Sequence, residues 1–269
     1  MNKISVVLVG AGAMGGALLR RWLDADIIDR RASAVFEPAP AAAIGEAARK
    51  ARLALNPPVA PASADALVLA VKPQAAGAAL PRFAALAGEA LTISIMAGVS
   101  LRTIEGLVRT PRLVRAMPNL PAQIGAGVSG LYAPAGVGAE DRAIAEALMT
   151  SVGETVWLRS EAEIDLVTAV SGSGPAYYFL LTEALAEAAV ALGLDAAAAA
   201  KLVRATAMGA GALIAADPRP AGELRRAVTS PGGTTEAALR VLDGDEQALR
   251  ALMMAAVAAA AKRARELSA

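Results

Sequence analysis

Apolar residues in the first half of the chain form short continuous runs, separated by segments with helical spacing. Such runs are typical of strands that are buried on both faces of a parallel sheet. Residues 4–10 form such a run, and further strand-like runs cover residues 33–37, 66–71, 91–96, 112–117 and 154–158. Helical spacing predicts helices over Met14–Asp24, over Pro40–Arg52 and between the third and fourth runs. The repeated β-α-β order predicts an open, doubly wound parallel sheet.

After about residue 160 the pattern predicts helices alone, over residues 177–194, 196–216 and 246–267. These segments are rich in alanine and apolar on most of their circumference, and a region this small cannot bury all of them internally. We therefore expect an intimate homodimer built from these helices. The alternative is a simple helical bundle packed on the first domain. The predicted domains are residues 1–159 and 160–269.

The composition narrows the available chemistry. The 269 residues carry a net charge of +1, and no basic run is interleaved with aromatic residues, so nucleic acid is not an expected partner. Cysteine and histidine are both absent. Their absence removes thiolate chemistry, the commonest general acid/base and most transition-metal sites, so no metal is expected. Catalysis must use hydroxyls, lysine, carboxylates, backbone groups or a bound cofactor.

A mean hydropathy of +0.48 raises the question of a membrane. The longest apolar run near the end, Ala251–Ala261, is too short for a span and is flanked by charges. The apolar N-terminal segment leads into glycines that indicate a turn rather than a cleavage site. We expect a soluble, cytoplasmic protein with no membrane partner.

A glycine-rich turn follows the first predicted strand. Gly10, Gly12 and Gly15 form G-x-G-x-x-G, directly after a buried strand and at the start of a helix, which is the context of a dinucleotide-binding fingerprint. Gly10 would allow the tight turn, Gly12 the close approach of a pyrophosphate, and Gly15 the packing of helix on strand. Ala13 and Met14 begin the helix whose free amides would face the phosphates. The predicted fold class is α/β: an N-terminal Rossmann-like doubly wound parallel sheet followed by an all-α C-terminal dimerisation domain.

Glu37 lies 22 residues after Gly15, at the end of the second predicted strand. The fingerprint predicts an acidic residue at about this distance. A carboxylate there can accept both ribose hydroxyls of NAD and would repel the 2′-phosphate of NADP. The residues therefore favour NADH over NADPH as the coenzyme.

Three further loops follow predicted strands, at the sheet edge where open α/β folds bind ligands. They are residues 70–74, 96–100 and 117–121. Lys72 is expected against a phosphate or ribose, or else is a solvated lysine. Asn119 lies between two prolines, as a neighbour of the nicotinamide or in an ordinary turn. The residues assigned to the coenzyme from these loops are Ala70, Val71, Lys72, Pro73, Ala97 and Asn119.

The segment Leu224–Asp243 interrupts the alanine-rich helices with three threonines, a serine, a proline and two glycines between Thr229 and Thr235. Proline and glycine are poor helix residues, so the simple interpretation is a helix stop, a turn and an N-cap. A helix start whose amides are left free is also a site for a carboxylate. Both interpretations can hold together.

This segment, "TSPGGTTEAALRVLD", resembles the signature of the pyrroline-5-carboxylate reductases. The sequences "GSGPAYYF", "AVKPQ", the "AG" of "SIMAGVS" and "VRAMPNLP" resemble the same family, in the right order over nearly the whole chain. The resemblance implies a Rossmann domain, a helical domain that interlocks with its partner as a homodimer, and a larger ring of dimers, expected as a decamer of dimers. It also implies hydride transfer from NAD(P)H to the C=N carbon of 1-pyrroline-5-carboxylate, which gives L-proline in the last step of proline biosynthesis.

The resemblance assigns the substrate to the glycine-threonine segment. Gly232 and Gly233 would let the backbone close on a small ligand, and Thr234 would offer an amide and a hydroxyl to the substrate carboxylate. Thr235 matches the threonine placed near the ring nitrogen and is the candidate catalytic residue, as proton donor or as hydrogen-bond partner. Ser230 matches the family serine and is expected to support the loop.

The chain departs from the family pattern at two places. Glu37 stands where many relatives hold residues for a 2′-phosphate, and Arg226 stands where an acidic or neutral residue is usual. Other classes fit less well. The β-hydroxyacid dehydrogenases need a lysine where this chain has Tyr178, and ketol-acid reductoisomerases need an acidic cluster. A reductase of a related cyclic imino acid and a non-catalytic nucleotide-binding paralogue stay open.

Overall fold

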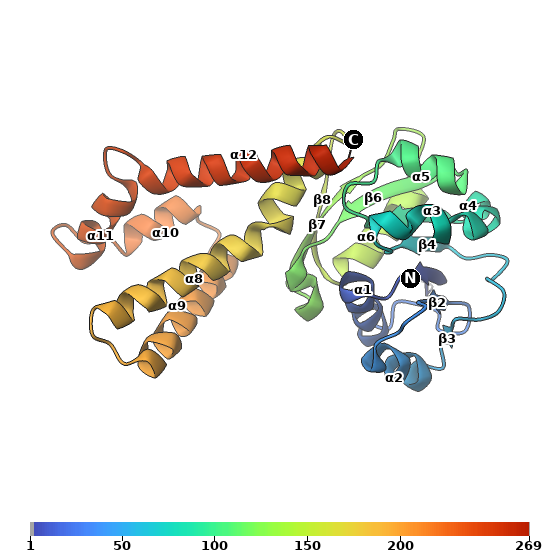
Figure 1. Ribbon diagram of the computed structural model, residues 1–269, viewed down its shortest axis with the longest axis horizontal. Coiled ribbons are helices and arrows are strands. Elements are labelled where there is room, and N and C mark those ends of the chain that lie inside the picture. Colours follow the sequence, from blue (N-terminus) through green and yellow to red (C-terminus); the bar gives the residue numbers. More distant parts are fainter. Residues whose placement is uncertain (1–2, 269) are drawn as a thin grey trace. The chain divides into compact units, whose positions relative to one another are not determined.

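The computed structural model describes residues 3–268, and their strands form one eight-stranded sheet (Figure 1). Its order is β3-β2-β1-β4-β5-β6-β7-β8, with every neighbouring pair parallel except β6 and β7. The strands are β1 Val6–Val9, β2 Ala34–Phe36, β3 Ala54–Leu55, β4 Ala66–Leu69, β5 Leu91–Ser94, β6 Leu113–Met117, β7 Gly127–Tyr132 and β8 Gly153–Trp157. The predicted doubly wound sheet is confirmed, with a mostly parallel pairing.

Helices cover both faces of the sheet, which explains why the strands read as continuous apolar runs. Along β1, Val6 and Leu8 enter one apolar cluster with Trp22, while Val7 and Val9 enter a second cluster on the other face. The helices of this region are α1 Ala13–Asp24, α2 Ala42–Ala51, α3 Ala76–Ala79, α4 Ala84–Glu89, α5 Leu101–Val108, α6 Ala139–Thr150 and α7 Glu163–Val167.

Strand β7 was not predicted, and it makes the one antiparallel pairing in the described sheet. Its sequence, GVSGLY, contains two glycines, which weaken the strand signal. The structure gives a reason for one of them, since a Cβ at Gly130 would lie 2.8 Å from the Val167 side chain. The close contact with Val167 thus requires glycine at position 130, and this glycine weakens the sequence pattern from which β7 could have been predicted.

The chain divides into two compact units. Unit 1 comprises the described residues of Met1–Ser173 and of Ala260–Ala269, and unit 2 is Gly174–Ala259. Residues 160–173 and 260–268, which the sequence analysis places in the helical domain, therefore pack with the sheet. The Ser268 hydroxyl donates a hydrogen bond to Asp165 Oδ1 at 3.1 Å, which ties these two segments together.

Unit 2 is built from helices within the residues that the structure describes. They are α8 Gly174–Ala191, α9 Ala196–Ala216, α10 Ala221–Ala227, α11 Thr234–Asp243 and the first half of α12 Ala248–Ser268. Helices α8 and α9 pack as a hairpin that turns at Gly193, with φ +101°, and Asp195 caps α9 by accepting from two amides. Helix α9 is the one described helix that is long and apolar enough to cross a membrane by length and composition.

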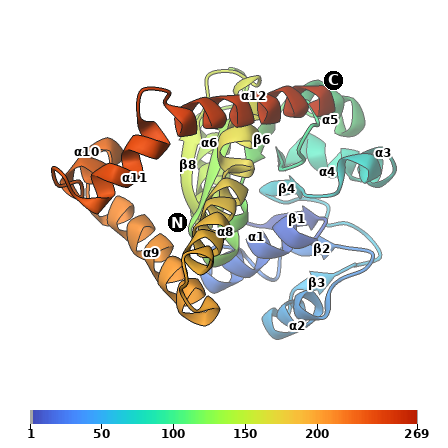
Figure 2. The same ribbon diagram turned by 60° about the vertical axis from the view of Figure 1, so that its left-hand side comes forward.

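Asp243 joins three helices of unit 2. Its carboxylate accepts hydrogen bonds from Arg225 on α10 and from Arg250 on α12, and Figure 2 shows α10 and α11 beside one another. The hydrogen bonds from Arg250 and then from Arg225 lower the pKa of Asp243 to about 2.

This lowered pKa predicts acid-sensitive packing of the three helices. A folded-state pKa below the unfolded value of 3.8 gives stability that is complete above the unfolded pKa and is lost as the pH falls toward 2. We expect Asp243→Asn to lower the free energy of unfolding at about pH 6, and the difference from wild type to shrink below about pH 4. Denaturant unfolding at several pH values measures this. Asp245→Asn is the control, and an Asp243→Asn effect that does not change with pH would contradict the assignment.

Candidate active site

The glycine fingerprint connects β1 to α1 with the backbone geometry that its spacing predicts. Gly10 has φ +96°, and a Cβ there would lie 2.6 Å from the carbonyl oxygen of Ala70. A Cβ at Gly15 would collide with the Gly10 carbonyl. A Cβ at Gly12, by contrast, would meet nothing within 4 Å. The fold thus requires glycine at positions 10 and 15. Gly12 instead borders open space that no protein atom fills.

That space belongs to a cavity of about 570 Å³ at the carboxyl ends of β1, β2 and β4. Of the predicted coenzyme residues, those that line it are Gly10, Gly12, Ala13, Glu37, Ala70, Val71 and Lys72. No described side chain caps α1, so its first amides are free to bind a ligand. An uncapped helix start beneath a glycine turn fits a pyrophosphate, because amides and helix dipole both favour an anion there.

Glu37 lines the cavity at the end of β2, and its position is fixed by backbone groups. Its Oε2 accepts a hydrogen bond from the Ala11 amide at 2.8 Å, and its Oε1 accepts one from the Ala39 amide at 3.2 Å. The Asn56 side chain holds the backbone of Glu37 through two further hydrogen bonds, at 2.9 and 2.8 Å. A carboxylate has about four acceptor sites, so capacity remains for two hydroxyl groups.

The cavity lining also contains two arginines that were not predicted from the sequence. They are Arg20 on α1 and Arg82 in the turn before α4. The Arg82 guanidinium lies 5.1 Å from the ring centre of Phe36 and 4.7 Å from that of Phe83. With Lys72, the cavity lining holds three cations and one carboxylate. This balance suits an anionic ligand. The missed arginines carry no local motif, since only the packing brings them to the cavity.

The remaining predicted coenzyme residues do not line this cavity. Met14 packs against the core and Pro73 begins a 3-10 turn after β4. Ala97 lies on the exposed part of the loop after β5. Asn119 is 8% exposed and ties its loop to β7 and to the helical segment Thr168–Gly172, because its Oδ1 accepts from Val128 N at 2.9 Å and its Nδ2 donates to the Ser171 carbonyl at 3.2 Å.

The predicted substrate segment forms the start of α11 in unit 2. Gly232 has φ +70°, and Gly233 is the N-cap residue, whose amide donates to the Ser230 carbonyl at 3.0 Å. A Cβ at Gly233 would lie 2.6 Å from the Ser230 hydroxyl oxygen. Ser230 and the two glycines therefore form one tight turn, as the predicted helix stop and N-cap require.

Thr234 and Thr235 follow as the first two residues of α11. No described side chain caps the helix, and within the described chain neither threonine hydroxyl makes a hydrogen bond. Glu236, which the sequence analysis did not single out, accepts a hydrogen bond from the Gly232 amide at 2.7 Å. That bond, with the nearby Arg240, lowers the pKa of Glu236. The turn is thus fixed by Glu236 while the amides of both threonines stay available to a ligand.

The fingerprint, the cavity and the carboxylate at the end of β2 define an NAD(P)-binding oxidoreductase of the Rossmann type. The family model described as NADP oxidoreductase, coenzyme F420-dependent, matches residues 5–98. The model for pyrroline-5-carboxylate reductase dimerisation matches residues 161–267.

Relatives with known names match this chain over three quarters of its length or more. The pyrroline-5-carboxylate reductase of Pseudomonas aeruginosa is 45% identical over 209 residues, which are 77% of this chain and 76% of that protein. The Synechocystis enzyme of the same name is 37% identical over 98% of both chains. The solved structure of a pyrroline-5-carboxylate reductase from Coxiella burnetii superposes with a TM-score of 0.91, 35% identity and full coverage of both chains. This chain belongs to the pyrroline-5-carboxylate reductase family.

Proposed function

We propose that this chain catalyses the NAD(P)H-dependent reduction of 1-pyrroline-5-carboxylate to L-proline, the last step of proline biosynthesis. The observation that carries the proposal is the uncapped start of α11 at Thr234, directly after the tight turn at Gly232 and Gly233, in a member of this family. A bound coenzyme would supply a hydride to the C=N carbon, and a proton on the ring nitrogen would complete the secondary amine.

The residues of the α11 turn suit the two polar groups of this substrate. The amides of Thr234 and Thr235 point from a helix start, where backbone donors and the helix dipole favour a carboxylate. The free hydroxyl of Thr235 is our candidate for the hydrogen bond to the ring nitrogen. Ser230 and Glu236 hold the turn in shape through Gly233 and Gly232. Histidine and cysteine are not needed, because an imine that binds protonated requires no strong acid.

The coenzyme that the residues favour is NADH. Glu37 is held by two backbone amides with its carboxylate on the cavity, where it can accept ribose hydroxyls and would repel a 2′-phosphate. The relative from Plasmodium falciparum, 27% identical with a TM-score of 0.82, was crystallised with NADP bound. We therefore base the expected coenzyme preference of this chain on Glu37 and its neighbours, and not on membership of the family.

The helical unit suits assembly into a homodimer. Its helices expose large apolar side chains, among them Phe179, Leu180, Met208 and Leu213, each more than half exposed in the single chain. The family model for this region is named for dimerisation. We propose a homodimer as the basic unit, a ring of such dimers as the larger assembly, and the cytoplasm as the compartment. In this proposal the apolar surface of α9 is covered by a second chain rather than by a membrane.

The test is an oxidation assay of the purified chain with NADH and with NADPH against a panel of cyclic imines. We expect the highest kcat/KM with 1-pyrroline-5-carboxylate and NADH. A higher kcat/KM with 1-pyrroline-2-carboxylate or the six-membered homologue would reassign the substrate. A clear preference for NADPH would contradict the role of Glu37, and coenzyme binding without turnover of any imine would indicate a non-catalytic paralogue.

A further inference from the structure

The loop between β5 and α5, residues 95–100, is held at both of its ends by serine side chains. At its start, the Ser94 hydroxyl accepts a hydrogen bond from the Met96 amide at 3.3 Å. At its end, Ser100 caps α5 by accepting from the Thr103 amide at 3.2 Å. We call this segment the 95–100 loop. Its short length and its two anchors leave few conformations open to it.

The middle of the 95–100 loop packs against a segment from the far end of the sequence. Gly98 has φ +69°, and a Cβ there would lie 2.8 Å from the carbonyl oxygen of Leu267 in the last turn of α12. The neighbouring Ser268 hydroxyl bonds to Asp165. All of these residues belong to unit 1, so the packing is internal to one compact body.

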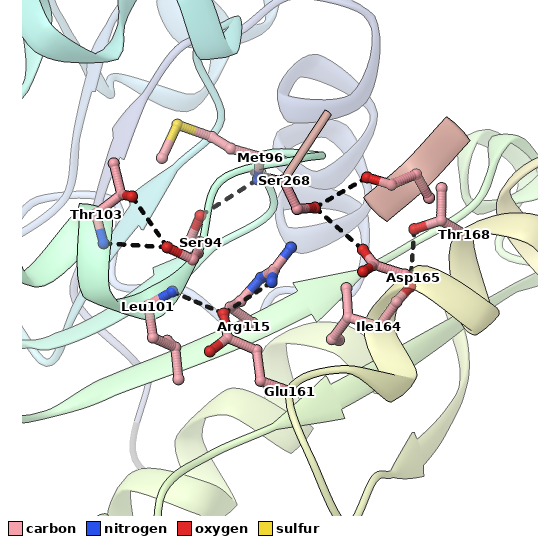
Figure 3. A network of polar contacts seen from close by, with 12 residues as sticks. Ser94, Met96, Leu101, Thr103, Arg115, Glu161, Ile164, Asp165, Thr168 and Ser268 are labelled. Carbon is pink, nitrogen blue, oxygen red and sulfur yellow. Dashed lines mark hydrogen bonds and ion pairs between the residues drawn. The ribbon is translucent and has the colours of Figure 1, made fainter. Parts of the chain in front are cut away.

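A third anchor comes from Glu161, which lies between β8 and α7. As Figure 3 shows, its Oε1 accepts two hydrogen bonds at once, from the Leu101 amide at 2.7 Å and from Arg115 Nη1 at 2.8 Å. Leu101 is the first residue of α5, directly after the 95–100 loop. One oxygen atom therefore joins the end of this loop to strand β6.

The energetics make this anchor firm. Arg115 is only 4% exposed, and a buried guanidinium without an acidic partner is costly. The positive end of the α5 dipole favours a carboxylate beside its first amide. Arg115 also pairs in register with Ser94, the last residue of β5. Glu161 thus fixes the start of α5 relative to the ends of β5 and β6.

The location of the 95–100 loop connects this anchor to the coenzyme. Strand β5 neighbours β4, and the residues after β4, Ala70 to Lys72, line the coenzyme cavity. Glu37, assigned to the adenosine ribose, lies at the end of β2, on the other side of β1 from β4. A dinucleotide that binds across the switch point of the sheet therefore directs its other half toward the ends of β4 and β5.

We propose that Glu161 is a positioning residue that sets the 95–100 loop where the nicotinamide half of the coenzyme reaches the end of β5. The inference rests on the proposed function, and it assigns this task to a residue outside the cavity lining. Glu161 acts through the Leu101 amide, and Arg115 holds its carboxylate in place. Loss of the anchor changes the placement of the loop but leaves the groups that bind the adenylate and pyrophosphate untouched.

Three substitutions and one control separate positioning from simple stability. Glu161→Ala removes the acceptor, and Glu161→Asp shortens the side chain while leaving a charge near the buried Arg115, in case the alanine variant folds poorly. Glu161→Gln keeps an oxygen acceptor of the same length. Asp141→Asn is the matched control, because Asp141 likewise forms an ion pair with an arginine, Arg112, at the opposite end of β6, with hydrogen bonds of 2.7 and 3.0 Å.

Hydrogen–deuterium exchange of the 95–101 peptide, without and with NADH, is the first measurement. In the Glu161→Ala and Glu161→Asp variants we expect exchange without NADH to rise about tenfold, because the Leu101 amide loses its acceptor. We expect NADH to slow exchange in the wild-type loop, and this protection to be lost in both variants. Glu161→Gln keeps an oxygen acceptor for the Leu101 amide, so this variant and Asp141→Asn should retain the NADH protection of wild type. Equal exchange in all five proteins would overturn the proposal.

Kinetics and coenzyme affinity are the second measurement. For Glu161→Ala and Glu161→Asp we expect kcat to fall about tenfold to a hundredfold, with the Kd for NADH within about twofold of wild type, and Glu161→Gln to restore kcat. Faster exchange with an unchanged kcat would show a structural role only and overturn the proposal. A wild-type chain that reduces no imine, yet shows NADH protection that the variants lose, would refute the proposed function and leave the positioning role standing.

Discussion

Gly12→Ala will raise the Kd for NADH by about tenfold or more while leaving the thermal unfolding midpoint near that of wild type. The added methyl group meets no protein atom within 4 Å, so any cost falls on the ligand that fills this space. Alanine is a poorer N-cap residue than glycine, which lowers the stability of the folded state. Gly12 has φ −66°, an angle that alanine can adopt, and alanine also reduces the conformational entropy of the unfolded chain. These two effects on stability, each about 1 kcal/mol, oppose each other. Fluorescence titration with NADH and a thermal melt measure the two quantities.

Gly15→Ala is the contrasting variant. Its Cβ would collide with the Gly10 carbonyl and lie 3.0 Å from the Ala70 side chain, so the protein itself must yield. Overpacking of this kind costs about 1–3 kcal/mol of stability. We expect a lower melting temperature for Gly15→Ala and an unchanged one for Gly12→Ala. Unchanged NADH affinity in a stable Gly12→Ala variant would contradict the prediction that the coenzyme binds at this turn.

The second large effect is expected at the start of α11. Thr235→Ala should lower kcat for 1-pyrroline-5-carboxylate by about a hundredfold, the effect of losing one well-placed donor in a transition state. The Kd for NADH should stay within about twofold, because Thr235 lies in unit 2 and the coenzyme cavity is formed by unit 1. Stopped-flow turnover and NADH titration give both values.

Thr235→Ser keeps the hydroxyl and should retain most of the turnover. Thr206→Ala is a matched control, since the Thr206 hydroxyl donates to the Leu202 carbonyl within α9 and has no assigned role. A pH–rate profile of wild type and of Thr235→Ala separates the two roles of Thr235. Loss of a proton donor would change the pH dependence of kcat, whereas loss of a simple hydrogen-bond partner would lower kcat by a similar factor at every pH. Wild-type turnover in Thr235→Ala would end its candidacy.

Most of the sheet could be predicted from the sequence because strands β1, β2, β4, β5 and β6 are buried on both faces and are rich in apolar residues. Strand β7 could not, because Gly130 is set by a contact with Val167, 37 positions later in the chain. The glycine fingerprint was recognisable because its geometry is local to one strand–turn–helix unit. Arg20 and Arg82 were not recognisable, because nothing next to them in sequence indicates a cavity.

The same limit applies to the anchors of the two loops. Glu236 and Glu161 accept hydrogen bonds from the backbone amides of Gly232 and Leu101. Every residue except proline has such an amide, so the sequence does not indicate which amide a carboxylate binds. Glu236 is four residues from its partner and could have been proposed from helix geometry. Glu161 is 60 residues from Leu101, and only the fold brings the two together.

The return of α12 to unit 1 has a consequence for the order of events during synthesis. A ribosome makes the sheet and its glycine turn first, then the whole of unit 2, and only then residues 260–268, which complete unit 1. Until the Leu267 carbonyl arrives over Gly98, the 95–100 loop lacks one of its packing partners. A nascent chain can therefore form the glycine turn and the residues that line the cavity long before the 95–100 loop is fully packed, and residues 260–268 determine when the sheet unit is finished.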